Sequence, residues 1–295
     1  MNRLTKRQRE AFIGYLFIFI WIVGFGIFTI FPVVQSFIYS LSTVRITAEG
    51  LEIVDRVGFD NYQNAFVYIY FVEAIWNYIK NMVITIPSII FFSVIIGLLL
   101  NTDIKGRGIY RTIFFLPVII SSGPVLMKIQ SEGALVIPML SSNELINLIQ
   151  AGLPTFLSDG IQAIFAKIIL IMWFTGVPII IIIAGLQKID KSIYEAAAID
   201  GASGWESFWK ITLPSLKPLI NVITVFSMMS ISLFSSNQVF EIINSRRLTQ
   251  FGLSNAFSWI YFGVTLILLV LFLTIININF KRKPKTKKKV VNKHA

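Results

Sequence analysis

The chain has 295 residues, of which 55% are hydrophobic and 14% charged, and its formal net charge is +11. With a mean hydropathy of +0.75, it has too little polar surface for a water-soluble globular domain and too much apolar surface for a disordered chain. The absence of cysteine excludes disulfides, thiolate metal ligands and a cysteine nucleophile. The composition therefore predicts an all-α protein that crosses a membrane several times.

Six apolar segments are long enough to cross a bilayer. A hydrocarbon layer of about 30 Å needs about 20 apolar residues at a helical rise of about 1.5 Å per residue. The segments that meet this requirement are 12–36, 78–100, 112–130, 161–186, 219–240 and 253–279. The first is longer than a signal-peptide core and has no small-residue cleavage site, so we expect it to remain as an anchor. We expect a short N-terminus at 1–11, a transmembrane domain at 12–280 and a basic tail at 281–295.

Lysine and arginine indicate which ends of these spans face the cytoplasm. Nineteen of the 26 basic residues lie in four segments: 1–11, 101–113, 187–217 and the tail after residue 280. With six spans these segments all fall on one side, and the positive-inside rule makes it the cytoplasmic side. We therefore expect a multi-pass protein of the cell membrane with both termini in the cytoplasm. Nucleic-acid binding is disfavoured, because the charge is spread over membrane flanks and not gathered on a folded basic domain.

The sequence lacks the common motifs of nucleotide-binding and hydrolytic enzymes. It holds no GxxxxGK(S/T) phosphate-binding loop, no GxSxG and no HExxH. Its single histidine, His294, is the penultimate residue. We therefore expect that this chain is no enzyme and has no metal site and no cofactor of its own.

The loop between the fourth and fifth spans, 188–217, has the pattern of two short helices joined by a turn. The capping-box spacing S-x-x-E begins at Ser192 and again at Ser203, and each instance predicts a helix start. Gly201 suits the left-handed turn that ends a helix, and Pro214 is expected to close the second helix. The sequence therefore predicts a helix, a glycine turn and a second helix on the cytoplasmic face.

The second of these helices carries an aromatic stripe. Its members recur at the spacing i, i+3, i+4 and i+7, and they are Trp205, Phe208, Trp209 and Thr212. A short helix with such a face needs a partner: the lipid headgroup layer, the rest of this protein or another subunit. The aromatic pattern by itself does not decide among the three.

The spacing along the loop resembles a known signature. Glu195-Ala196-Ala197, three residues, Gly201, nine residues and Ile211-Thr212-Leu213-Pro214 are similar to the E-A-A-x3-G-x9-I-x-L-P signature of binding-protein-dependent ABC transport permeases. Further elements resemble the sugar-importing branch of that family: Gly58 with Asn61-Tyr62, Arg111 with Phe115-Leu116-Pro117, and Gly252 to Tyr261. The resemblance extends from about residue 12 to about residue 280.

The resemblance implies the transmembrane domain of a type I ABC importer, with the loop as a coupling helix in a cleft of the ATP-binding subunit. The coupling residues that it implies are Glu195, Ala196, Ala197, Asp200, Gly201 and Trp205. Glu195 would face the ATPase as a charged anchor or complete the capping box with Ser192, and Gly201 would let the loop pivot. The aromatic stripe would fix the coupling helix to its own transmembrane bundle.

The same resemblance implies the partners. We expect a second, similar but non-identical permease subunit, two ATP-binding subunits that use ATP and Mg, an extracellular solute-binding protein and the surrounding membrane lipid. ATP binding would close the ATPases, push the coupling helices and switch a cavity from inward-facing to outward-facing. The cargo that it implies is a sugar or oligosaccharide.

Polar residues inside the spans are candidates for the substrate path, because they are costly in lipid unless they face a cavity. We single out Ser122, Lys128, Gln130, Lys167, Ser235, Asn237, Gln238, Asn255 and Trp259. Hydroxyls, amides and an aromatic platform suit a polyhydroxylated sugar, although small hydroxyl residues also let helices pack closely. Lys128 and Lys167 fall at outer span ends, as does Lys80. They indicate an acidic saccharide, such as a uronate-bearing oligosaccharide, or they snorkel to the headgroups.

Two other transport classes remain as alternatives. A secondary transporter driven by an ion gradient would need an inverted repeat and a carboxylate near the membrane midplane, and the sequence shows neither. An ABC permease for a non-sugar solute is the second alternative. Only the resemblance of Asn61-Tyr62 and of Gly252 to Tyr261 to the sugar-importing branch argues against a non-sugar solute.

Overall fold

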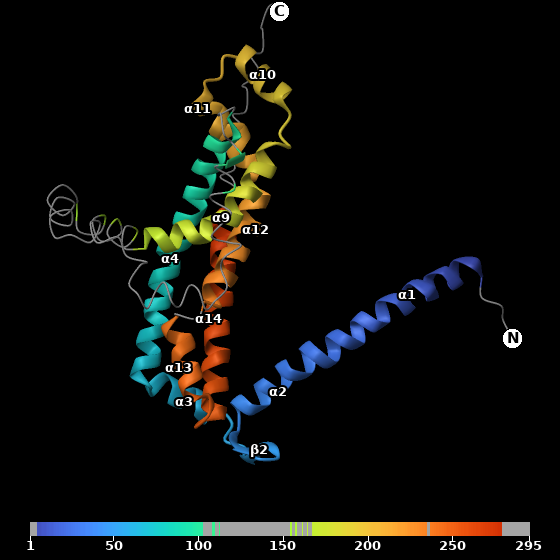
Figure 1. Cartoon of the computed structure of the whole chain (residues 1–295), viewed down its shortest axis with the longest axis vertical. Coiled ribbons are helices and arrows are strands. Elements are labelled where there is room, and N and C mark those ends of the chain that lie inside the picture. Colours follow the sequence, from blue (N-terminus) through green and yellow to red (C-terminus); the bar gives the residue numbers. More distant parts are fainter. Residues whose placement is uncertain are drawn as a thin grey trace, which may run out of the picture.

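The computed structural model describes residues 5–102, 167–234 and 237–278, together with isolated positions between 108 and 164. Helices make up most of this part of the chain, as the composition predicts (Figure 1). Four of the described helices are long and apolar enough to cross a membrane, or five if one bent pair counts as a single span. Apart from Thr112, the expected third span lies outside the described residues, as does the basic tail.

The described helices correspond to the other five expected spans. The first span consists of α1 (Lys6–Phe25), a π-helix η1 (Gly26–Ile30) and α2 (Phe31–Ser40). The second is α4 (Ile69–Asn101), the fourth is α9 (Ile168–Leu186) and the sixth is α14 (Phe251–Asn277). The fifth is built from α11 (Gly204–Ser207), a π-helix η3 (Phe208–Thr212) and α12 (Leu213–Ser232).

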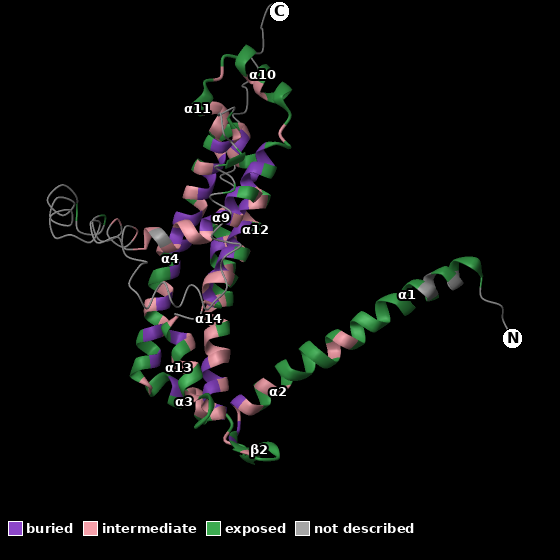
Figure 2. Ribbon diagram, viewed as in Figure 1, coloured by how far each residue is buried: buried purple, intermediate pink, exposed green. Residues whose placement is uncertain are grey.

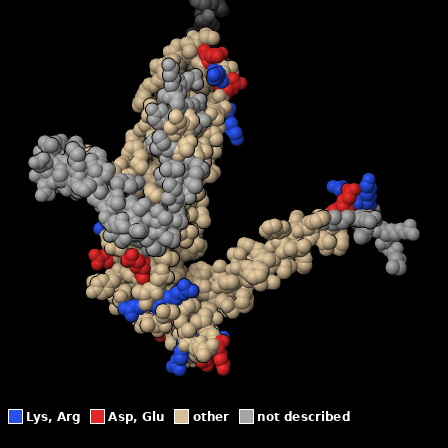
Figure 3. Space-filling model, in the orientation of Figure 1, with Lys and Arg blue, Asp and Glu red and all other residues tan. Residues whose placement is uncertain are grey.

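Short elements mark the two ends of the bundle (Figure 1). At one end, which we call the hairpin end, lie the antiparallel strands β1 (Thr43–Thr47) and β2 (Gly50–Asp55) with the helices α3 (Asp60–Val67) and α13 (Gln238–Arg247). At the opposite end, the loop end, lie α10 (Lys191–Ile199) and α11. On the face shown in Figure 3, charged side chains gather at these two ends and at the start of α1. The hairpin adds to the predicted all-α architecture, and its β-branched residues favour strands.

The two larger of three clusters of buried side chains in the described residues lie along the inner faces of the helices in Figure 2. The cluster toward the hairpin end joins α4, α12, α13 and α14, and includes Phe71, Met82, Met228, Val239 and Phe257. The cluster toward the loop end joins α4, α9 and α12, and includes Val94, Ile182, Leu216, Ile220 and Ile223. A small residue permits one close approach, because a Cβ at Gly97 would lie 2.5 Å from Ile182 Cγ2.

The first span leaves the bundle at an angle (Figure 1). Its last part, α2, packs on α14, where the Phe37 and Trp259 rings lie 5.2 Å apart and Ser36 Oγ donates to Asn255 Oδ1 at 2.7 Å. Its earlier part, α1, is exposed over most of its length, and Trp21 is 80% exposed. An apolar helix with such a surface requires lipid or another subunit around it.

A π-helix carries the fifth span through a proline. The Leu213 N–H bonds the Phe208 carbonyl, five residues back, and Pro214 follows directly. A proline ring has no N–H and clashes with the carbonyl four residues earlier, and a wider preceding turn relieves this clash without ending the helix. The expectation that Pro214 closes a helix is therefore wrong, because one helix runs through Gly204–Ser232. The π-helix η1 precedes Pro32 in the same way.

The fifth span is broken inside the expected segment 219–240, because α12 ends at Ser232 and α13 begins at Gln238. Asn237 is the N-cap of α13, and its Oδ1 accepts the Val239 N–H at 3.0 Å. A side chain that satisfies the N–H groups of a new helix competes with continuation of the old one. The break lies beside a polar cavity that is described below.

Candidate coupling loop and polar cavity

The coupling loop begins with α10, whose N-cap is Asp190. Its Oδ1 accepts the Ser192 N–H at 2.9 Å, so the helix starts at Lys191. The expected capping box from Ser192 to Glu195 is therefore wrong, because the carboxylate two residues earlier takes the N–H that a cap must satisfy. Hydrogen bonds from the backbone and the side chain of Ser192 hold the pKa of the Asp190 carboxyl below its ordinary value.

The helix α10 ends in the turn that Gly201 predicts. The Ala202 N–H donates to the Ala197 carbonyl at 2.9 Å, and the Gly201 N–H donates to the Ala198 carbonyl at 3.0 Å. These two bonds form a Schellman motif. The φ angle of Gly201 is 79°, in the left-handed region that glycine adopts without steric cost. The predicted glycine turn is confirmed.

The second predicted capping box is also confirmed. The Glu206 N–H donates to Ser203 Oγ at 3.3 Å, and the Ser203 N–H donates to Glu206 Oε2 at 3.1 Å. Lys210 Nζ lies 3.1 Å from Glu206 Oε1, one turn further along the helix. This ion pair is exposed and contributes little stability, so the cap determines where α11 starts.

Most of the coupling residues that the resemblance implies are exposed at the loop end. Glu195, Ala196, Asp200, Gly201 and Trp205 are exposed, and Ala197 is half-buried. The hydroxyls of Tyr194 and Thr212 lie 2.8 Å apart and fasten α10 to η3. The loop therefore presents an accessible surface that is tied to the start of the fifth span.

The aromatic stripe is divided between the bundle and the surface. Thr212 is buried and Phe208 is half-buried, whereas Trp205 is 71% and Trp209 is 50% exposed. The Trp205 and Trp209 ring centroids lie 5.6 Å apart. A cavity of about 640 Å³ between α10 and this helix is lined by residues that include Tyr194, Ala198, Ala202, Trp205 and Phe208. One half of the stripe anchors the helix, and the tryptophans remain accessible.

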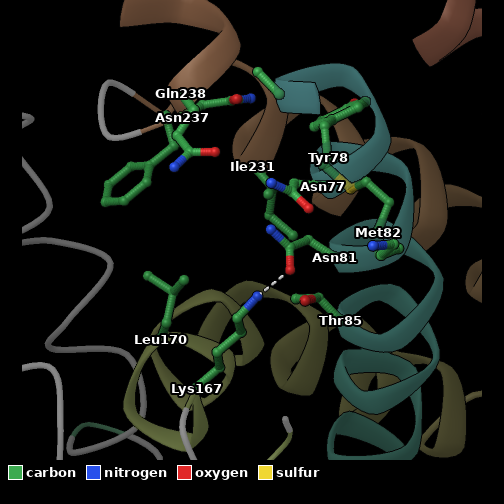
Figure 4. Close-up of a pocket in the computed structure, with 13 residues that line it drawn as sticks. Asn77, Tyr78, Asn81, Met82, Thr85, Lys167, Leu170, Ile231, Asn237 and Gln238 are labelled. Atoms are coloured by element: carbon green, nitrogen blue, oxygen red, sulfur yellow. Dashed lines mark hydrogen bonds between the residues drawn. The ribbon is translucent and has the colours of Figure 1, made fainter. Parts of the chain in front are cut away.

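A polar cavity of about 410 Å³ lies between α4, the start of α9 and the α12–α13 break (Figure 4). Its polar lining consists of Asn77, Tyr78, Lys80, Asn81, Thr85, Lys167, Asn237 and Gln238, and we call it the amide cavity. Lys167 Nζ donates a hydrogen bond to Asn81 Oδ1 (Figure 4). Asn81 lies twelve residues after the start of α4, or about 18 Å along the helix axis. The amide cavity therefore holds an amine and several amides beside α4, a helix that is long and apolar enough to cross a membrane.

The structure brings together some of the residues singled out for the substrate path. Lys167, Asn237 and Gln238 line the amide cavity. Asn255 and Trp259 lie elsewhere, against α2. Ser122, Lys128, Gln130 and Ser235 lie outside the described residues. Lys167 lies directly before α9, at the end of its span, and its amine reaches Asn81 of α4.

The second span contributes cavity residues that the sequence did not single out. Asn77, Asn81 and Thr85 recur every four residues, a spacing that places them on one face of a helix. That spacing is visible in the sequence. It becomes informative only once this face of α4 is known to turn toward α9.

Asn237 has a structural role in addition to its place in the cavity wall. Its Oδ1 caps α13, and its Nδ2 donates to the Tyr261 hydroxyl at 2.7 Å. Both ends of this amide therefore already bind protein groups. Gln238, the next residue, is exposed at the cavity.

A family model described as "Binding-protein-dependent transport system inner membrane component" matches residues 70–282. This range contains the described lining of the amide cavity and the whole coupling loop. The match covers well over half of the chain.

Several similar proteins are permeases of sugar transport systems. The trehalose/maltose transport system permease protein MalF of Thermococcus litoralis is 34% identical over 235 residues, which are 75% of this chain and 74% of that protein. The lactose transport system permease protein LacF of Rhizobium radiobacter is 32% identical over 217 residues, 72% of this chain and 70% of that protein.

A solved structure has the same fold. A chain in the crystal structure of a bacterial ABC transporter involved in import of the acidic polysaccharide alginate aligns with a TM-score of 0.61, over 92% of this chain and 97% of that chain. The two sequences are 20% identical, so this likeness concerns the fold. The family match, the relatives and this shared fold agree on the class of protein. The chain belongs to the binding-protein-dependent transport system inner membrane component family: it is the permease subunit of an ABC transporter, a multi-pass protein of the cell membrane and not itself an enzyme.

Proposed function

We propose that this permease subunit forms the translocation path of an ATP-driven importer for oligosaccharides that carry carboxylate groups. Membership of the family and the sugars named in its relatives support transport of a saccharide. The carboxylate is the finer part of the proposal. One observation carries it: an amine lies beside amides in the amide cavity, next to a helix that is long and apolar enough to cross a membrane.

Lys167 supplies the positive charge for this cargo. An ionisable side chain at membrane depth is costly, and such residues usually mark substrate or ion pathways. Its ammonium group has three N–H donors, and the bond to Asn81 uses one of them. Among the described residues the structure shows no partner for the other donors, so a carboxylate of a sugar acid can accept from them, and charge-assisted hydrogen bonds are stronger than neutral ones.

The rest of the lining suits the hydroxyl groups of a saccharide. Asn77 and Gln238 carry amides that both donate and accept hydrogen bonds, and Thr85 carries a hydroxyl. The ring of Phe234 adds an apolar wall against which a sugar face can pack. The volume of about 410 Å³ lies in the usual range for small-molecule sites, about 300–1,000 Å³.

Transport is driven from the loop end in this proposal. Two short exposed helices that are fastened to the fifth span suit the cleft of a separate ATPase, which itself uses ATP and Mg. The residues that contact the ATPase are Glu195, Ala196, Ala197, Asp200, Gly201 and Trp205. Alternating access then opens the amide cavity to one side of the membrane at a time.

Three kinds of partner complete the proposed importer. The exposed face of α1 suits a second, homologous permease subunit, because a lone apolar helix requires an apolar neighbour. Two ATP-binding subunits serve the loop ends of the two permeases. An extracellular solute-binding protein delivers the saccharide at the hairpin end, and both termini lie in the cytoplasm.

Replacing Lys167 by methionine tests the carboxylate assignment, because methionine keeps an unbranched side chain and removes the charge. We expect uptake of a uronate-bearing oligosaccharide by the whole importer in proteoliposomes to fall about tenfold or more, since a hydrogen bond to a charged group contributes about 1.5–3 kcal/mol. Uptake of a neutral oligosaccharide of the same length should change by about twofold at most.

Lys188→Met is the matched control, because Lys188 is an exposed lysine at the loop end, outside the amide cavity. We expect it to leave the ratio of acidic to neutral uptake unchanged. Equal losses of acidic and neutral uptake in Lys167→Met would contradict the carboxylate assignment and leave the permease function standing.

A further inference from the structure

One unbroken helix runs from the coupling loop to the amide cavity. The elements α11, η3 and α12 form Gly204–Ser232, which has 29 residues and is about 43 Å long at the helical rise. We call this helix the coupling rod. Trp205 lies near its exposed end, and its other end reaches the cavity, where Ile231 and Phe234 are part of the wall.

A tyrosine hydroxyl ties the cavity end of the coupling rod to the next helix. Tyr261 of α14 donates to the Ser232 carbonyl at 2.9 Å and accepts a hydrogen bond from Asn237 Nδ2 at 2.7 Å. Asn237 is the N-cap of α13. This hydroxyl is therefore a bridge between the last turn of the coupling rod and the first turn of α13.

A second chain of hydroxyls ties the same turn to α4. The Tyr78 hydroxyl lies 2.6 Å from Ser232 Oγ and 3.0 Å from Thr265 Oγ1. Thr265 Oγ1 donates to the Tyr261 carbonyl at 2.9 Å. Because each hydroxyl has one hydrogen, Thr265 accepts from Tyr78, and Tyr78 accepts from Ser232. We call Tyr78, Ser232, Asn237, Tyr261 and Thr265 the polar clasp.

The polar clasp compensates for the break in the fifth span. The carbonyl groups in the last turn of a helix have no intrahelical donor, and the bilayer core supplies no water in its place. The Tyr261 hydroxyl satisfies the carbonyl of Ser232. Tyr78 and Ser232 are 4% and 6% exposed, and the other three members of the clasp are half-buried. A movement of the rod end therefore strains these bonds or moves their partners.

We propose that the polar clasp is the output end of the coupling rod and passes a displacement of the rod to α13 and the cavity wall. The proposal assumes the coupling role proposed above for the loop, and it does not depend on the cargo. A movement at Trp205 reaches Ser232 along a continuous helix, and Tyr261 passes it to Asn237. Tyr261 is thus a positioning residue for Gln238, the neighbour of Asn237 in the cavity wall.

A purely stabilising clasp would behave differently. Without the Tyr261 hydroxyl, less importer would assemble, but in every assembled complex α13 would still move when ATP binds. With a transmitting clasp, assembled complexes bind ATP and the response of α13 is lost. A probe on α13 in assembled complexes separates the two roles.

The chain contains no cysteine, so a cysteine at Gln238 can carry a nitroxide label. Complexes without this cysteine give the background. In the purified importer without saccharide, we expect a non-hydrolysable ATP analogue to change the spectrum of the label. We expect Tyr261→Phe to reduce that change about fivefold or more, because the variant loses both hydrogen bonds of the Tyr261 hydroxyl and a single one already corresponds to about that factor. Hydrolysis per assembled complex should change by less than about twofold.

Tyr62→Phe is the matched control, because it removes a hydroxyl that lies 2.7 Å from Ser40 Oγ, outside the clasp. It should leave the label response intact. If Tyr261→Phe complexes do not assemble, Thr265→Val is the second clasp variant, since it removes the acceptor for Tyr78 and the donor to the Tyr261 carbonyl and keeps the side-chain shape. The proposal is overturned if the clasp variant shows the full label response. It is also overturned if Tyr62→Phe loses as much of the response as the clasp variant, or if the label does not respond to the ATP analogue when the clasp is intact.

Discussion

Three residues determine the shape of the loop 188–217 through contacts that are local in sequence. Asp190 starts α10, Gly201 ends it, and Ser203 starts the next helix. Each acts where a helix end leaves backbone groups without partners. The loop therefore has its form before any ATPase binds, and its surface is preorganised for a partner.

Asp190 gives α10 a dependence on pH. Its pKa is lowered in the folded protein, so its stabilising effect is present above about 3.9, the ordinary aspartate value, and is lost as the pH falls through the lowered folded value. We expect hydrogen-exchange protection of the α10 amides to decrease in that pH window. In Asp190→Asn the cap is retained without a titrating group, so protection should show no such step. The same pH profile in both proteins would contradict this role.

The residues that sequence predicted well are those controlled by their sequence neighbours. The Gly201 turn and the Ser203 cap are confirmed, since both depend on local hydrogen bonds. The predicted Ser192 cap is wrong because both Asp190 and Ser192 can cap the start of α10, and the Asp190 carboxylate accepts the backbone N–H of Ser192. Asn77 and Asn81 were missed because their position in the cavity depends on which face of α4 meets α9. Tertiary packing decides that face.

At the scale of elements, α14 packs through a glycine. A Cβ at Gly252 would lie 2.0 Å from the Ser42 carbonyl oxygen, close to where β1 begins. Gly263 lies in the same helix and has nothing within 4 Å of a Cβ built there. Substituting alanine at each position therefore distinguishes the effect of a steric clash from the effect of helix propensity.

We expect Gly252→Ala to destabilise the protein by about 1–3 kcal/mol, the usual cost of overpacking, because a backbone carbonyl cannot turn aside as a side chain can. Gly263→Ala should be neutral or stabilising by up to about 1 kcal/mol, because alanine favours helix. Thermal unfolding midpoints in detergent would measure both effects. A midpoint in Gly252→Ala equal to that of Gly263→Ala would refute the close approach.

Hydropathy predicts where the described spans lie but not where they end or break. The helix α4 extends back to Ile69 because its first turns bury Phe71 and Ala74 in the core. The fifth span continues back through Pro214 because a π-helix accommodates the ring, and it breaks before Asn237 because that side chain caps a new helix. These features depend on hydrogen-bond geometry and burial. Hydropathy averaged over a sequence window contains no information about either.

At the scale of the whole molecule, the chain has three surfaces that call for partners. The loop end exposes α10 and the start of α11, the hairpin end exposes a strand pair, and α1 exposes an apolar helix. The coupling rod joins the first of these surfaces to the amide cavity. In the proposal above, a force applied at the loop end therefore reaches the proposed substrate path along this helix.

The central claim is that a separate ATPase drives a saccharide through this chain. Its most direct test rebuilds the importer in vesicles from this permease, its proposed second permease, the ATP-binding subunits and the solute-binding protein, and follows a labelled oligosaccharide. We expect uptake only when ATP and the solute-binding protein are both present, with no uptake from an ion gradient alone. Uptake by this chain alone, driven by an ion gradient without ATP, would contradict the claim.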